Sequence, residues 1–172
     1  MVRVLRFPVL GGVMLLLCPA AGFAAPIAAS PQATGEVTLI RPMSLSRLGN
    51  LDFATLGVTT GGTATINPFT GAMTVTGGLL HLAGTPSRAL YQGAATKQTV
   101  VNIRVPNQPI LIRRVGGTET LTVDQFTLDG QDKRALAQAQ SFTFGVGARI
   151  TVPAGTVDGV YTGEIDVTIQ YP

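Results

Sequence analysis

The stretch FTFGVGARITV, residues 142–152, alternates apolar side chains with small or polar ones along its whole length. A period of two predicts a β-strand with one buried face. Gly145 and Gly147 fall on the opposite face, where we expect them to flatten or bend the strand. The predicted core face consists of Phe142, Phe144, Val146, Ala148, Ile150 and Val152.

The segments before this stretch repeat the pattern in shorter pieces. The runs TATIN and AMTVT flank Asn67-Pro68 and Gly71, which predicts a hairpin over Gly61–Gly78 that Leu79–Leu82 extend. In TETLTVDQFTL, Thr118–Leu128, the apolar residues change parity, so we expect a bulge near Asp124-Gln125 that returns them to one face. Further short strands are predicted at Glu36–Ile40, Ala89–Gln92, Val100–Val105 and Ile110–Ile112.

For two segments, the sequence does not decide between a helix and a loop. Gln131–Gln140 (QDKRALAQAQ) is the best helix candidate, but it has no sustained apolar stripe, so a loop is equally compatible. A short helical turn is possible at Leu45–Leu48, where Leu48, Leu51 and Phe53 are expected to be apolar anchors.

The chain closes on GVYTGEIDVTIQYP, residues 159–172, which predicts one regular final strand with its acids facing outward. We expect the first and last strands to contribute most of a strand-pairing core. Its predicted residues are Val37, Leu39, Phe53, Tyr161, Ile165, Val167, Ile169 and Tyr171.

Short strands with turn signals every 8 to 12 residues or so are typical of an all-β, antiparallel β-sandwich. Abundant threonine and valine suit a pleated, half-buried surface, and few charges leave few solvated helical faces. Closure into a barrel is left open by the pattern.

The first residues predict export. Met1–Phe7 carries Arg3 and Arg6, Val9–Leu17 is largely apolar, and small residues follow. This is the pattern of a secretory signal peptide, expected to be cleaved after Ala24, and the apolar run is too short for a membrane span. We therefore predict a signal peptide at 1–24, a mobile N-terminal segment at 25–35, and one β-sandwich domain at 36–172. The expected location is the periplasm, the cell surface or the extracellular space.

The cysteine and charge content narrows the possible partners. Cys18 is the only cysteine, and because Leu17 precedes it, where a lipoprotein site needs a small residue, we expect it to be lost with the signal. Loss of Arg3 and Arg6 lowers the formal net charge from +3 to +1. Arg113 and Arg114 form a pair and not a patch, so no nucleic-acid or anionic membrane partner is expected.

The sequence holds no catalytic or cofactor signature. His81 is the only histidine, so neither a histidine-based triad nor a zinc site is indicated. The run Asp129–Asp132 lacks the spacing of a calcium loop and is interpreted as a polar turn. Glu164 and Asp166 lie about 7 Å apart by strand rise, but alternating acids are usual on a solvated strand face. We expect no enzyme, no cofactor and no metal.

Two stretches resemble exported bacterial domains related to pilins. LDFATLG, residues 51–57, is similar to an L-[DN]-F-G-x motif, in which glycine usually stands at the position of Ala54. AGTVDGVYTGEIDVTIQY, residues 154–171, resembles the close of one uncharacterised secreted family and of spore coat protein U-like subunits of archaic chaperone–usher pili. The resemblance implies an immunoglobulin-like sandwich, completed in pilins by a neighbour's strand, with identical or related subunits and a periplasmic chaperone and usher as partners.

Two functions remain open on this basis. The first is a non-catalytic pilus- or fimbria-like subunit or surface adhesin that acts by β-strand pairing. The second is a self-complete secreted sandwich that binds carbohydrate or a surface protein, with Tyr91 as a weak candidate for an exposed aromatic, although we expect its ring to be buried. The segment Glu36–Met43 either donates its strand to another subunit or folds back on its own sandwich.

Overall fold

The computed structural model of the chain describes residues 34–39, 42–137 and 141–172. The chain divides into two units, Met1–Thr38 and Leu39–Pro172, and all the strands lie in the second. The predicted signal peptide, and all but the last two residues of the predicted N-terminal segment 25–35, lie outside the described residues.

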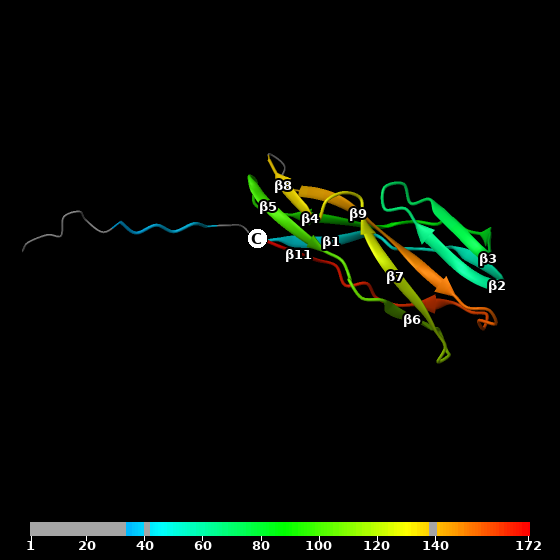
Figure 1. Cartoon of the computed structure of the whole chain (residues 1–172). Helices are drawn as coiled ribbons and strands as arrows, with labels where there is room; N and C mark the ends of the chain where they lie inside the picture. The colour runs from blue at the N-terminus through cyan, green and yellow to red at the C-terminus, as the bar shows by residue number, and fades with distance from the viewer. Residues whose placement is uncertain (1–33, 40–41, 138–140) are drawn as a thin grey trace, which may run out of the picture. The chain divides into compact units, whose positions relative to one another are not determined.

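The described residues form an all-β, antiparallel β-sandwich (Figure 1), as the sequence predicts. One sheet has the order β1-β4-β9-β7-β6-β10, with the β2–β3 hairpin joined to it through β9, and the other has the order β11-β5-β8. The strands are β1 (Ser44–Gly49), β2 (Thr55–Ile66), β3 (Met73–Ala83), β4 (Ala89–Ala94), β5 (Thr99–Arg104), β6 (Ile110–Arg114), β7 (Thr120–Leu128), β8 (Lys133–Leu136), β9 (Ser141–Val152), β10 (Tyr161–Thr162) and β11 (Thr168–Gln170).

The β9 strand is the centre of the larger sheet, where it pairs with β2, β4 and β7. Its predicted core face is confirmed, because Phe144, Val146 and Ala148 are fully buried. The two glycines serve a different purpose from the one expected. A Cβ at Gly145 or Gly147 would stand 2.3 Å from the Pro68 carbonyl oxygen or 2.1 Å from that of Ile66, so they let the β2–β3 turn lie against the strand.

The predicted hairpin and bulge are both confirmed. The Asn67 side-chain oxygen accepts hydrogen bonds from the backbone N–H groups of Phe69 and Thr70, and so fixes the turn between β2 and β3. The register of β7 against β9 shifts between Asp124 and Thr127, where Gln125 has a φ of 47°. This shift keeps the apolar residues on both sides of it against the core.

Four segments differ from what the sequence suggests. Residues 36–39 of the expected first strand form no strand, and the possible helical turn at Leu45–Leu48 is part of β1, with Leu48 exposed. The helix candidate Gln131–Gln140 contains β8, which forms because it pairs with the edge of β5. The single closing strand is two strands, since β10 pairs with β6 of the larger sheet and β11 with β5 of the smaller one.

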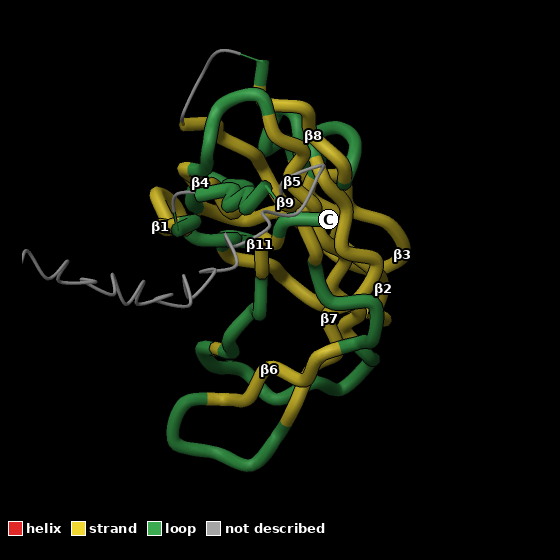
Figure 2. The backbone as a smooth tube through the Cα atoms, turned by 90° about the vertical axis from the view of Figure 1, so that its left-hand side faces the viewer, coloured by secondary structure: helices red, strands yellow, loops and turns green. Residues whose placement is uncertain are grey.

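The smaller sheet covers only part of the larger one. Ile103 of β5 and Ile169 of β11 belong to the same hydrophobic cluster as Phe144 of β9, which joins the two layers at that end. Figures 1 and 2 show β5 and β8 at one end of the sandwich and β6 at the other. The smaller sheet therefore does not cover the core face of β6 or the neighbouring parts of β7 and β9.

Candidate functional site

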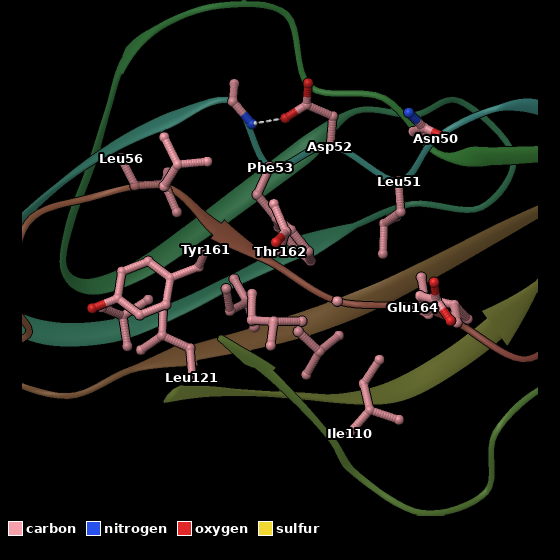
Figure 3. A pocket seen from close by; sticks show the side chains of 18 of the residues that line it. Asn50, Leu51, Asp52, Phe53, Leu56, Ile110, Leu121, Tyr161, Thr162 and Glu164 are labelled. Atoms are coloured by element: carbon pink, nitrogen blue, oxygen red, sulfur yellow. Dashed lines mark hydrogen bonds between the residues drawn. The ribbon is translucent and has the colours of Figure 1, made fainter. Parts of the chain in front are cut away.

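A large groove lies over the part of the larger sheet that the smaller sheet does not cover. Its volume is about 1010 Å³, and buried core side chains of β7 and β9 form its floor (Figure 3). A concave space lined by apolar side chains with a few polar groups is the usual form of a binding site in soluble proteins. The floor consists of Ile110, Ile112, Leu121, Val123, Ile150 and Val152.

One wall of the groove is the segment before β2. Asp52 and Ser87 exchange backbone hydrogen bonds of 2.9 Å in both directions, which ties this wall to the start of β4. The Asp52 carboxylate also accepts a 2.7 Å hydrogen bond from the Ala54 N–H, and Ala54 has a φ of 57°. Figure 3 shows that this turn directs Leu51 and Phe53 into the groove.

The other wall is the beginning of the closing segment. Tyr161 lies in β10, and its hydroxyl donates a 2.7 Å hydrogen bond to the Val157 carbonyl. Gly163 passes so close to β6 that a Cβ there would stand 2.6 Å from the Ile112 side chain. Residues 163–167 then belong to no strand of the described chain, so their backbone is free of sheet pairing on both sides.

The predicted strand-pairing residues fall into three groups. Phe53, Tyr161 and Ile165 line the groove. Val167, Ile169 and Tyr171 pack into the core beyond it. Val37 and Leu39 are 79% and 87% exposed and lie in no strand, so their role in strand pairing stays a prediction.

Tyr91, the weak candidate for an exposed aromatic, is buried, which is the outcome that the sequence favours. It is only 8% exposed, and its ring stacks on Phe144 with the centroids 5.4 Å apart. Its other end faces the groove, where burial raises the pKa of the phenol, the nearby Arg47 guanidinium lowers it and the Asp166 carboxylate raises it. The alternation around Tyr91 indicates a buried ring, but no sequence signal places Arg47 and Asp166 near it.

Two of the polar candidates from the sequence, His81 and Asp129, have structural partners. The Nε2 atom of His81 lies 3.1 Å from the Gly84 carbonyl oxygen, on the exposed edge of β3. Asp129 pairs with Arg134 at 2.6 Å and accepts a 2.7 Å hydrogen bond from the Gly145 N–H, so it fixes a turn. Glu164 and Asp166 are exposed and lie along the groove.

Within the described ranges, no group of three or more histidine, cysteine or acidic side chains is arranged to hold a metal ion. The same residues contain no helix with the length and apolar character needed to cross a membrane.

Comparison with known proteins gives one match. The sequence pattern of a family described as "Domain of unknown function (DUF4402)" matches residues 43–171, which include both walls and the floor of the groove. This agrees with the expected uncharacterised domain family, whereas the relation to pilin subunits stays a prediction. No curated protein and no solved structure matches the chain.

Proposed function

This chain belongs to the DUF4402 family, and from that premise we propose that it is a non-catalytic, exported structural subunit or surface adhesin of a pilus- or fimbria-like assembly. In this proposal the subunit acts by β-strand pairing with identical or related subunits, after delivery by a periplasmic chaperone and usher. The observation that carries the proposal is the groove, whose floor is the apolar core of the sandwich.

An extended strand suits the groove better than a small ligand does. The floor presents rows of apolar side chains, and the wall at residues 163–167 offers backbone N–H and C=O groups outside any ladder. Such an edge recruits another strand, whose main chain supplies hydrogen bonds while alternate side chains enter the apolar floor. A carbohydrate-binding face usually presents exposed aromatic rings, and of the aromatic side chains that line the groove Phe53 and Tyr161 are half-buried and Tyr91 is buried.

The N-terminal segment of another copy is the proposed strand. Val37 and Leu39 are large, exposed and separated by one residue, so an extended chain would present both on the same face. Burial of two such side chains in a partner's groove would contribute about 1.5–3 kcal/mol each. Met43, four residues after Leu39, packs beside Ala95 and Val101, where the chain enters its own sandwich.

Crosslinking between copies tests this proposal. Cys18 lies in the predicted signal peptide, so an exported Leu39→Cys, Ile112→Cys double variant would carry only the two introduced cysteines. A short bismaleimide should join the thiol introduced on the N-terminal segment of one copy to the thiol introduced on β6 of the next, and give a ladder of dimers, trimers and longer chains. The matched control is Leu39→Cys, Leu111→Cys, because Leu111 is the neighbour of Ile112 on β6 but is 65% exposed.

The control variant should give far fewer and shorter products than the groove variant. Equal ladders from both variants would show that contact is not through the groove. A monomer that unfolds reversibly and gives no ladder would overturn the proposed function and favour a self-complete binding module.

A further inference from the structure

At the Tyr91 end of the groove, the tyrosine hydroxyl is available for a hydrogen bond. Tyr91 lines the groove and is more than nine-tenths buried, yet its hydroxyl has no hydrogen-bond partner among the described residues. The ring cannot turn away, because it is stacked on Phe144 in the core. Once a strand covers the groove, a hydroxyl without a partner carries a cost that a matching polar group on that strand would remove.

The charged side chains that line the groove are mostly negative. Arg47 and then Asp166 act electrostatically on Tyr91, and Glu164 lies two residues before Asp166 on the same unpaired wall. No ion pair within the described chain engages any of these three charged side chains. Over the whole groove, four carboxylates face a single guanidinium: Asp52, Asp158, Glu164 and Asp166 against Arg47.

We infer that the Tyr91 end of the groove is a subsite for a guanidinium group on the incoming strand. The Tyr91 hydroxyl oxygen accepts a hydrogen bond from the guanidinium, and the Asp166 carboxylate pairs with its charge. This inference rests on the proposed function, since it assumes that a strand enters the groove. Together the two groups make the groove selective for a strand with one cation among its apolar residues.

The N-terminal segment of a second copy has this composition. In EVTLIRPM, residues 36–43, Arg41 is the only cation, and it has the same parity as Val37 and Leu39. If these apolar residues enter the groove, Arg41 must enter with them. A guanidinium on the apolar face would be costly without partners, and the Tyr91–Asp166 end supplies both a hydrogen-bond acceptor and a counter-charge.

Subunit exchange between fluorescently labelled copies of the full exported chain tests the inference. Arg41→Met keeps an apolar residue of similar length, Tyr91→Phe keeps the stacked ring, and Asp166→Asn changes an exposed side chain. Each variant should exchange subunits roughly tenfold faster than wild type, as expected for loss of a charge-assisted hydrogen bond. Asp132→Asn, an exposed acid that does not line the groove, is the matched control and should exchange at the wild-type rate.

Combined variants give the decisive result. Arg41→Met with Tyr91→Phe should exchange no faster than Arg41→Met alone, because both changes remove the same contact. Arg41→Asp with Asp166→Arg should recover part of the loss caused by either change alone.

The outcomes separate this inference from the proposed function. If wild-type oligomers form and all three single variants exchange at the wild-type rate, the guanidinium subsite is wrong while strand pairing stands. If wild-type chains form no oligomers, both are wrong.

Discussion

Arg149 of β9 holds Asp124 of β7 through two parallel hydrogen bonds, 2.9 Å from Nε to Oδ1 and 2.8 Å from Nη2 to Oδ2. The pair crosses the ladder at the residue where the β7 bulge begins. Its two-point geometry fixes the position of the bulge as well as attracting opposite charges. It therefore keeps the residues on both sides of the bulge directed toward the core.

This pair predicts a loss of stability in acid. The hydrogen bond from Arg149 lowers the pKa of Asp124 below its ordinary value. A carboxylate whose pKa is lower in the folded state adds stability above its unfolded pKa, and loses it as the pH falls through the folded pKa. Asp124→Asn should lower the melting temperature by about 2 °C at pH 7, and the difference from wild type should shrink below about pH 4. A difference that stays constant from about pH 7 to about pH 2 would contradict this assignment.

The backbone conformation of Ala54 predicts that a glycine at this position of the groove wall stabilises the protein. It is a non-glycine residue with a φ of 57°, a conformation that glycine adopts without the steric cost of a Cβ. Ala54→Gly should raise the free energy of unfolding by about 0.5–1 kcal/mol in urea denaturation. The control is Ala72→Gly, at an exposed alanine that is not among the positive-φ residues, and it should lower stability. Destabilisation by Ala54→Gly would show that this turn does not have the conformation described.

The close packing at Gly147 predicts that adding even one methyl group there destabilises the fold. Because its Cβ would stand 2.1 Å from the Ile66 carbonyl oxygen, the β2–β3 turn would have to move away from β9. Gly147→Ala should cost more than about 3 kcal/mol of folding free energy, or prevent accumulation of folded protein. Gly35→Ala, where a Cβ would meet nothing within 4 Å, is the control and should change stability little. The comparison is made by chemical denaturation, and equal effects would exclude close packing of the turn on β9.

Tyr171 and Tyr91 should respond differently to substitution by phenylalanine. The Tyr171 hydroxyl accepts a 3.0 Å hydrogen bond from the Thr96 N–H and lies 3.2 Å from the Thr96 hydroxyl oxygen, so it ties the end of the chain to the segment before β5. Tyr171→Phe should therefore destabilise the isolated subunit by about 1 kcal/mol. Tyr91→Phe removes a hydroxyl that has no partner, so it should leave subunit stability unchanged in the same thermal unfolding assay. A comparable loss from both variants would contradict the open hydroxyl at Tyr91.

The sequence alone predicts those elements in which the apolar alternation and the turn residues indicate the same structure. The β2–β3 hairpin, the core face of β9 and the bulge at Asp124 follow from local patterns, because one buried face dictates the register. The β8 strand does not, since Lys133–Leu136 has no apolar period and becomes a strand only by pairing with β5. Here the tertiary partner decides the local structure.

The groove could not be predicted from the sequence, for a related reason. Phe53 and Tyr161 have the pattern of ordinary core residues, and nothing local reveals that the smaller sheet ends before it covers them. The split of the closing segment is hidden in the same way, because alternation shows which side chains face inward but not which sheet a strand joins. The exposure of Val37 and Leu39 is not readable either, because alternation shows that two side chains share a face but not which surface that face meets.

The closing segment has a mechanical consequence. It is bonded to the smaller sheet through β11 and, farther from the end of the chain, to the larger sheet through β10. Tension applied at Pro172 must therefore peel β11 from β5 before it can load β10, so the first rupture would leave the larger sheet intact.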